Sequence, residues 1–225
     1  MNITTIVFDF GNVLGFFNQR KAAEQLAVYS PLSADDILTF YLDSQLEDDF
    51  ESGRISLAAF RDIVRQRCRV TASDEQLDLA IADMFTPNDE VCRLIPELKP
   101  HYRLVLLSNT NELHAVHFRR QFADTLNHFD TLILSHEVGL RKPCADIYAH
   151  CHKVAGARPS QCLFLDDLPA NIEAARACGW HGIVYHSGLD LRRELRRLGI
   201  EIPPSPPTPL PRSEGEGSDG TRTRG

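Results

Sequence analysis

Three acidic side chains, one serine and one lysine stand where they could take part in catalysis together. They are Asp9, Ser108, Lys142, Asp166 and Asp167. The acidic residues and the serine each follow a short apolar run at the point where it gives way to a loop. Carboxylates that share a pocket repel one another unless one is protonated or a cation binds between them. Oxygen ligands of this kind favour Mg²⁺, which takes one or two carboxylates and keeps several waters.

A Mg²⁺ ion, an ammonium group and a hydroxyl together suit a phosphoryl group, whose oxygens need positive charge and hydrogen-bond donors. A carboxylate beside that group can attack phosphorus and form an aspartyl phosphate. Asp9 is the carboxylate that we expect to attack. By itself it would more commonly be a turn or helix-cap residue, so the other three stretches carry the catalytic interpretation.

The elements that must position these residues are parallel strands joined by helices. Residues 3–8 are rich in β-branched side chains and alternate too little for a half-exposed strand, which predicts a central strand covered on both faces. Further strands are predicted over 104–107, 131–134, 162–165 and 182–185, with helices near 112–122, 145–155, 170–178 and 189–198. This alternation predicts an α/β fold with a mostly parallel sheet. Ligands of such sheets lie beyond the carboxyl ends of the strands.

The segment between the first and second of these strands has a different pattern. Between about residues 18 and 98 apolar residues recur at three- and four-residue spacing, and Ser33 and Ser56 stand where they could cap helix N-termini. We therefore expect an all-helical cap domain over 17–98, inserted after the first strand of a core formed by 1–16 and 99–202. Residues 203–225 are rich in Pro, Ser, Gly and charge, and we expect a disordered tail.

The composition excludes several functions. Of the 225 residues 43% are hydrophobic and 24% charged, as in ordinary globular proteins, and the net charge is −7. This acidity argues against nucleic-acid and membrane surfaces. No run approaches the roughly 20 apolar residues of a spanning helix, and neither a signal peptide nor a Cys-x-x-Cys pair is evident. We expect a cytoplasmic protein with reduced cysteines and a small phosphorylated metabolite as partner, and leave monomer or dimer open.

Four motifs in order resemble those of the haloacid dehalogenase (HAD) superfamily. They are Phe-Asp-Phe-Gly-Asn-Val-Leu from residue 8, Leu-Leu-Ser-Asn-Thr-Asn from 106, Gly-Leu-Arg-Lys-Pro from 139, and Phe-Leu-Asp-Asp-x-x-x-Asn from 164. Each is weak alone, but four in order at strand ends are specific. The resemblance spans about residues 3–200 and implies a three-layer Rossmann-like core. It includes bacterial phosphatases of α-glucose 1-phosphate and, more distantly, the N-terminal phosphatase domain of soluble epoxide hydrolases.

The resemblance also implies a role for each motif residue. Asp9 would be the nucleophile and a Mg²⁺ ligand, with the backbone carbonyl of Gly11 as a second ligand. Ser108 and the amide of Asn109 would hold the phosphoryl oxygens, and Lys142 would neutralise charge between nucleophile and phosphate. Asp167 would bind Mg²⁺ directly, Asp166 would bind it directly or stand behind it, and Asn171 would orient the loop. Residues 50–56 resemble the helix-turn-helix signature of the family's small cap, which closes over the substrate.

The chain departs from the family at one position. Most phosphatases of the family carry a second Asp two residues after the nucleophile, as general acid and base, and this chain has Gly11. Such catalysis is typically worth about 10²- to 10⁴-fold. We hypothesise a substrate with a good leaving group, such as the anomeric oxygen of a hexose 1-phosphate. His114 could supply the proton, although an exposed or capping histidine is the more common case. The acidic run 43–51 is expected on a solvated cap face.

Two other functions fit the same motifs. One is hydrolytic dehalogenation through an aspartyl ester, as in metal-independent 2-haloacid dehalogenases, although such enzymes have no need of the Asp166-Asp167 pair. The other is a non-catalytic phosphate-binding protein that keeps the fold and has lost turnover. The motifs favour a Mg²⁺-dependent phosphomonoester hydrolase of a small sugar phosphate, without identifying the sugar.

Overall fold

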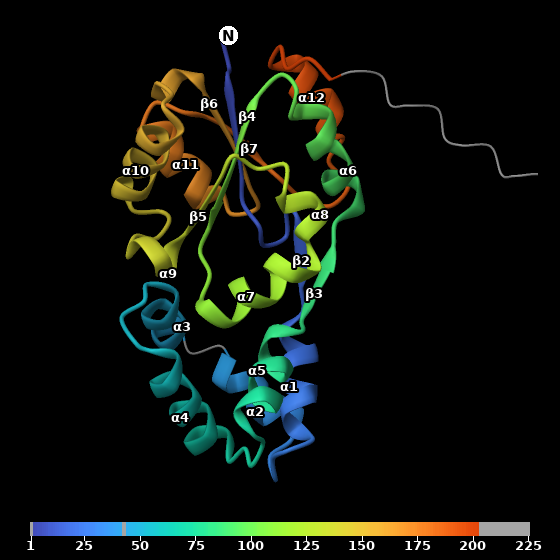
Figure 1. Cartoon of the computed structure of the whole chain (residues 1–225), viewed down its shortest axis with the longest axis vertical. Coiled ribbons are helices and arrows are strands. Elements are labelled where there is room, and N and C mark those ends of the chain that lie inside the picture. Colours follow the sequence, from blue (N-terminus) through green and yellow to red (C-terminus); the bar gives the residue numbers. More distant parts are fainter. Residues whose placement is uncertain (1, 42–43, 203–225) are drawn as a thin grey trace, which may run out of the picture.

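A five-stranded parallel sheet forms the centre of the computed structural model, which describes residues 2–41 and 44–202 (Figure 1). The strand order is β5-β4-β1-β6-β7. The strands are β1 Thr5–Phe8, β4 Arg103–Ser108, β5 Thr131–Leu134, β6 Cys162–Asp166 and β7 His181–Val184. These agree with the predicted strands to within two residues at each end, which confirms the α/β class.

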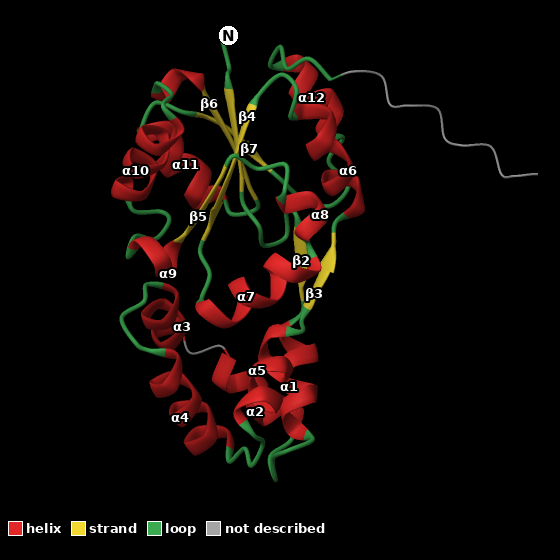
Figure 2. Ribbon diagram, viewed as in Figure 1, coloured by secondary structure: helices red, strands yellow, loops and turns green. Residues whose placement is uncertain are grey.

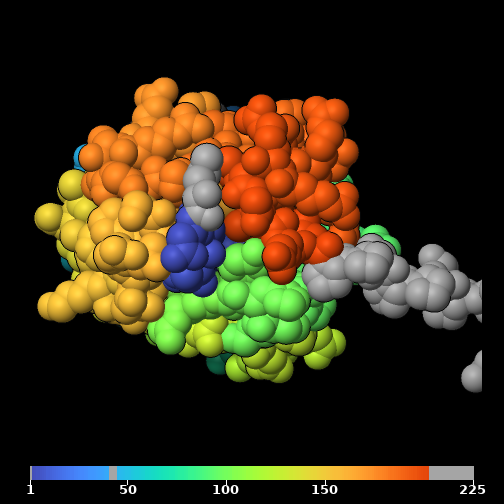
Figure 3. All heavy atoms as spheres, turned by 90° about the horizontal axis from the view of Figure 1, so that it is seen from above, coloured from blue at the N-terminus to red at the C-terminus, as the bar shows by residue number. Residues whose placement is uncertain are grey.

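Strand β1 lies at the middle of the sheet and is buried along its whole length. Val7 pairs with Val105 of β4 on one side and with Phe164 of β6 on the other, both in parallel register. In Figure 3 the N-terminal segment (blue) emerges between segments of the second half of the chain, on the face opposite the helices at the bottom of Figure 1. The carboxyl ends of β1, β4 and β6 therefore open toward those helices.

Helices cover both faces of the sheet, giving three layers (Figure 2). Helices α10 Ala145–Ala155 and α11 Pro169–Ala177 lie on one face, and α6 Asp89–Leu98, α8 Ala123–Leu126 and α12 Leu191–Arg197 lie on the other. The alternation of the strand residues decides which layer each contacts: Val7 packs with the first set, whereas Ile6 and Phe8 pack with the second. Burial on both faces explains why β1 reads as a continuous apolar run.

A second group of helices forms a lobe beyond the carboxyl ends of the strands, here called the helical lobe. It consists of α1 Gln19–Ala27, α2 Ala34–Tyr41, α3 Ser44–Glu51, α4 Leu57–Cys68 and α5 Asp74–Ala82. Its own apolar cluster includes a stacked pair, Phe50 and Phe60, with ring centroids 4.1 Å apart. The predicted caps are present: Ser56 Oγ accepts from Ala59 N at 3.2 Å and Ser33 Oγ from Asp36 N at 3.2 Å.

Two features of this region differ from the sequence-based expectation. The strands β2 Gly15–Phe17 and β3 Phe85–Pro87 pair antiparallel at the base of the lobe, and three-residue strands are too short to leave a periodic signal. Helix α6 falls inside the range 17–98 predicted for the cap, yet Leu94 and Ile95 pack in the sheet cluster. Residues 203–225, predicted to be disordered, lie outside the described part of the chain. No helix among the described residues is long and apolar enough to cross a membrane.

Helix α7 Glu112–Gln121 joins the two parts. Leu113 belongs to the apolar cluster of the helical lobe, whereas Ala115 and Phe118 belong to that of the sheet. His114 therefore stands in the chain between side chains that pack into different cores. The remaining short helices are α9 Ser135–Val138, which follows β5, and a 3-10 turn, Pro159–Gln161, ahead of β6.

Candidate active site

Asp9 lies just beyond β1, at the start of a tight loop. Its Oδ1 accepts a hydrogen bond of 2.7 Å from the backbone N–H of Phe10. The ring of Phe10 stacks on Phe118 at 4.1 Å between centroids, which anchors the loop in the core. Asn12 has a φ of 54°, a left-handed conformation that asparagine adopts more readily than most residues. The loop thus turns sharply while the Asp9 carboxyl group stays beside the strand end.

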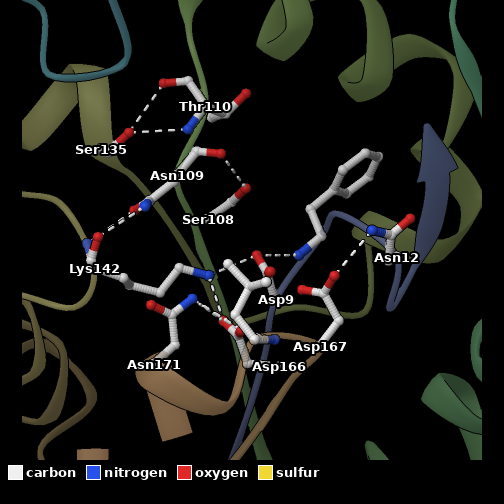
Figure 4. Close-up of polar contacts among 12 residues, drawn as sticks. Asp9, Asn12, Ser108, Asn109, Thr110, Ser135, Lys142, Asp166, Asp167 and Asn171 are labelled. Carbon is white, nitrogen blue, oxygen red and sulfur yellow. Dashed lines mark hydrogen bonds and ion pairs between the residues drawn. The ribbon is translucent and has the colours of Figure 1, made fainter. Parts of the chain in front are cut away.

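Lys142 brings a buried ammonium group to this carboxyl group (Figure 4). Its Nζ lies 2.8 Å from Asp9 Oδ1 and 2.7 Å from Asp166 Oδ2, and the lysine side chain is 1% exposed. The Asn109 side chain holds the Lys142 backbone on both sides: Oδ1 accepts from Lys142 N at 2.9 Å and Nδ2 donates to Lys142 O at 3.0 Å. The end of β4 therefore fixes the residue that carries the ammonium group.

Asp166 is fully buried at the end of β6, with hydrogen bonds on both of its oxygens. Asn171 Nδ2 donates to Oδ1 at 2.9 Å and to Oδ2 at 3.0 Å, and the backbone N–H of Leu168 donates to Oδ1 at 2.8 Å. The carbonyl of Asn171 accepts from the Tyr148 hydroxyl at 2.9 Å, which ties α11 to α10. Both carboxylate oxygens of Asp166 are therefore already bonded, to Lys142, Asn171 and Leu168.

Asp167 is half-buried and faces the other side of Asp9, toward the first loop (Figure 4). Asn12 Nδ2 donates to Asp167 Oδ2 at 2.9 Å. One carboxylate oxygen from each of Asp9, Asp166 and Asp167 lies within 4.8 Å of the other two. Three acidic oxygens so close together, with one ammonium group beside them, are a suitable donor set for a hard divalent cation such as Mg²⁺.

The pKa shifts of the clustered groups agree with a site for a cation. Burial raises the pKa of Asp9 to about 8, and the negative charges of Asp166 and Asp167 add to this against the opposing pull of Lys142. Burial and the charge of Asp166 likewise raise the pKa of Asp167, against the Asn12 hydrogen bond. Burial alone would lower the pKa of Lys142, but Asp9 and Asp166 outweigh it and raise that pKa. One ammonium group does not balance three carboxyl groups, so the site has room for further positive charge.

Ser108 ends β4 and is buried, with its hydroxyl 3.3 Å from the carbonyl of Asn109. Ser108, Asn109 and Gly11 line one wall of a cavity of about 80 Å³. The sheet thus brings the predicted residues together: ion pairs and hydrogen bonds join Asp9, Lys142, Asp166 and Asn171. A carboxylate oxygen of Asp167 lies within 4.8 Å of one from Asp9 and one from Asp166, and Ser108 lies on the adjoining cavity. The side chain of Asn109 is committed to Lys142, so any contact of Asn109 with a phosphoryl oxygen falls to its backbone.

A model of the haloacid dehalogenase-like hydrolases matches residues 3–179, which is most of the chain. The chain belongs to this family. The assignment agrees with the resemblance that the four motifs indicate. It also accounts for the parallel sheet with acidic residues at the ends of its central strands.

Individual relatives of this hydrolase narrow the class of enzyme. It is 29% identical over 199 residues to D-ribitol-5-phosphate phosphatase of Bacteroides thetaiotaomicron, covering 86% of this chain and 97% of that one. It is 36% identical over 93 residues to bifunctional epoxide hydrolase 2 of the mouse, covering 41% of this chain and 17% of that one. The magnesium complex of a HAD family enzyme from B. thetaiotaomicron superposes with a TM-score of 0.75 at 25% identity, covering 87% and 100%. The hydrolase is a HAD-like phosphatase, an enzyme that acts on phosphoric monoesters.

The other wall of the 80 Å³ cavity comes from the helical lobe, where the acidic run 43–51 was expected on a solvated face. Glu47 and Glu51 of α3 line it. Arg141 contacts this helix twice: its Nε lies 2.9 Å from Glu51 Oε2, and its Nη1 lies 2.6 Å from Asp48 Oδ1. The acidic run is therefore only partly a solvated face. Its spacing of three and four residues places these carboxyl groups on one side of α3, which was a signal available in the sequence.

His114 also differs from the prediction, which favoured an exposed or capping residue. The cap of α7 is Asn111, whose Oδ1 accepts from His114 N at 3.0 Å. The His114 ring is half-buried, lies edge-on to Phe85 and lines the 80 Å³ cavity together with Gly11. It lines a second cavity as well, of about 40 Å³, whose other walls include Phe40, Phe50 and Phe60 of the helical lobe. The two cavities thus share the His114 ring, and the second, here called the aromatic recess, is lined mainly by the helical lobe.

Proposed function

We propose that this hydrolase is a Mg²⁺-dependent phosphomonoesterase that cleaves a small sugar or polyol phosphate through an aspartyl phosphate, with a hexose 1-phosphate as the best candidate. One observation carries the proposal: the buried Lys142 ammonium bridges Asp9 and Asp166 beside Asp167, next to a cavity lined by Ser108. A buried lysine between carboxylates could be structural alone. The open cavity beside it and the unbalanced acidic charge support a phosphoryl site.

Asp9, Asp167 and the carbonyl of Gly11 would hold the metal ion. The oxygens of Asp166 are already occupied by Lys142, Asn171 and Leu168, which favours a place behind the ligands rather than among them. When bound, Mg²⁺ supplies the positive charge that ionises the carboxyl groups and withdraws charge from the phosphoryl oxygens. The ribitol-phosphate enzyme and the magnesium complex among the relatives support this cofactor and this substrate class.

Asp9 would attack phosphorus through Oδ2, because Phe10 N–H and Lys142 Nζ both contact Oδ1. The new bond joins Asp9 to phosphorus, and the bond from phosphorus to the substrate oxygen breaks. The departing oxygen takes a proton from the surroundings. Water then attacks phosphorus, which releases inorganic phosphate and restores the Asp9 carboxylate. Lys142 stays charged throughout and stabilises the negative charge on the transferring oxygens.

The glycine at position 11 decides which leaving groups suit this chemistry. A carboxyl group there would deliver the proton to the departing oxygen, and Gly11 has none. The anomeric oxygen of a hexose 1-phosphate is less basic than that of a primary alcohol and depends less on protonation. This is the reason to place hexose 1-phosphates ahead of 6-phosphates.

Release of phosphate from a panel of phosphorylated metabolites in the presence of Mg²⁺ tests the proposal. The panel compares glucose 1-phosphate, glucose 6-phosphate and ribitol 5-phosphate, with a 2-haloacid as the substrate of a dehalogenase. Asp9→Asn is the control, and it should abolish turnover while keeping the fold. Release of halide that survives EDTA would favour the dehalogenase instead, and no turnover of any compound would favour a binding protein. Equal turnover by Asp9→Asn would refute the nucleophile.

A further inference from the structure

His114 carries a buried nitrogen that has no protein partner. Among the described residues its Nε2 is one of few buried side-chain polar atoms without a hydrogen bond. A buried polar group left unpaired costs free energy, typically about 1 to 3 kcal/mol. Such a group is therefore expected to have a partner that the chain itself does not supply.

The neighbour of the ring decides which nitrogen carries the proton. Asn111 Oδ1 accepts from the backbone N–H of His114, so the other end of the same amide, Nδ2, faces the ring. That Nδ2 lies 3.0 Å from His114 Nδ1. An amide N–H₂ can only donate, so Nδ1 accepts and is unprotonated, and the proton of the neutral ring is on Nε2. Burial lowers the pKa of His114 to about 4, with smaller contributions from His117 and His136, so the ring is neutral at pH 7.

The position of the ring indicates what the partner is. It lines both the cavity that contains Gly11 and Ser108 and the aromatic recess of the helical lobe. A phosphoryl group bound beside Ser108 would direct its leaving group toward these walls. The ring shares this cavity with Ser108 and Asn109, and we expect it to meet the leaving group rather than the phosphate.

We propose that His114 selects the leaving group: as a neutral imidazole, it donates a hydrogen bond from Nε2–H to an uncharged oxygen of the alcohol portion of the substrate. The inference rests on the proposed function and deepens it, since it makes the substrate a hydroxylated monophosphate rather than a bare alkyl or aryl one. His114 is a binding residue in this account and gives up no proton.

The charged side chains around the His114 ring restrict which kind of substrate oxygen can bind there. Glu47 lines both cavities with His114, and Glu51 lines the first. A carboxylate or a second phosphate at this place would meet two acidic side chains, of which Glu51 alone is paired with Arg141. A hydroxyl can accept from Nε2 and donate to a carboxylate at once. Hydroxyl groups therefore suit the site, and bisphosphates do not.

The test compares one substrate that has such an oxygen with one that lacks it. Values of kcat/KM are measured with Mg²⁺ for glucose 1-phosphate, or ribitol 5-phosphate if it is the faster, and for phenyl phosphate. In His114→Phe the ratio of the sugar value to the phenyl value should fall by about three- to tenfold, the range for one lost neutral hydrogen bond. His114→Gln keeps an N–H donor and should recover much of the ratio. His117→Gln, on the same helix and directed to Asp83, is the matched control and should keep the wild-type ratio.

A second measurement does not depend on turnover. In ¹⁵N spectra of the imidazole rings at pH 7, His114 should be the neutral tautomer with its proton on Nε2. Its Nε2 resonance should shift when glucose 1-phosphate or ribitol 5-phosphate is added, and inorganic phosphate should shift it less. A proton on Nδ1, an equal response to inorganic phosphate, or an unchanged substrate ratio in His114→Phe would overturn the inference. Absence of turnover with a selective Nε2 shift would refute the phosphatase and leave the His114 contact standing.

Discussion

The two walls of the active-site cavity differ in how far their polar groups are already bonded within the protein. On the sheet side Lys142, Asp166, Asn171 and Asn109 hold one another through short contacts, and both oxygens of Asp166 are occupied. On the side of α3 and α7 aromatic rings predominate, and His114 Nε2 has no protein partner. A saturated network keeps its geometry without a ligand, whereas an unsatisfied wall gains most from one. This contrast supports our proposals that the sheet side carries the reaction and the other side selects the substrate.

The largest effect should come from breaking the sheet side at Lys142. Lys142→Met leaves Asp9 and Asp166 buried without a counter-charge, which typically costs about 3 to 5 kcal/mol, and activity should fall below detection. Urea unfolding and phosphate release measure the two losses. Lys99→Met is the control, because Lys99 also pairs with an aspartate, Asp130, but its own side chain is 33% exposed. Such pairs contribute about 1 kcal/mol or less, so a similar loss in both variants would contradict the special role of Lys142.

A carboxyl group at position 11 would give the sheet side the general acid that it lacks. Gly11→Asp should raise kcat for glucose 6-phosphate relative to p-nitrophenyl phosphate by about tenfold or more, since only the sugar alcohol needs protonation. The new Cβ would lie 3.3 Å from the ring of Phe17, which is 40% exposed and can move aside. Steady-state kinetics with both substrates give the ratio. Gly11→Asn has the same shape without the proton, and an equal gain there would count against the explanation.

Metal affinity should depend on the residue that orients Asp167. Asn12→Gly removes the 2.9 Å hydrogen bond while glycine keeps the left-handed φ of 54°. Loss of such a partner typically weakens metal binding by about 10- to 100-fold. The Mg²⁺ concentration for half-maximal activity should rise accordingly, and EDTA should abolish activity in both proteins. If Asn12→Gly lowers only kcat at every Mg²⁺ concentration, Asn12 does not act through the metal.

The smallest expected effect is a change of KM with pH, caused by Glu47 on the α3 wall of the cavity. Burial raises the pKa of Glu47 to about 7, helped by the charges of Glu51 and Asp48 and opposed by Arg141. Glu47 therefore becomes negative as pH rises through 7 and should repel an anionic substrate, so KM should increase by a few-fold between about pH 6 and 8. Glu47→Gln should flatten that rise. Wild type and variant share His114 and the titration of the substrate, so their pH profiles of KM can be compared directly.

Much of the sheet side could be predicted from the sequence, because parallel strands bring their carboxyl ends to one edge. Ser108 and Asp166 end strands and Asp9 directly follows one, so their separation along the chain did not matter. The other wall was harder, since it depends on how α3 packs against the end of β5 and on which face of α7 turns inward. Glu51 is brought near Arg141 by a hydrogen bond from Ser135 Oγ to the Glu51 carbonyl, which no spacing predicts. The ring of His114 was misjudged because helical position alone does not give burial.

Two consecutive residues, Arg141 and Lys142, contact opposite sides of the cavity. Arg141 contacts α3, and the next residue, Lys142, contacts the nucleophile. This dipeptide therefore links the helical lobe to the catalytic carboxyl group through two adjacent side chains. The two Asn109 bonds hold the lysine backbone to β4 on both sides. The Lys142 backbone is thus held independently of the Arg141 contacts, so a change in how Arg141 meets α3 need not displace the ammonium group from Asp9.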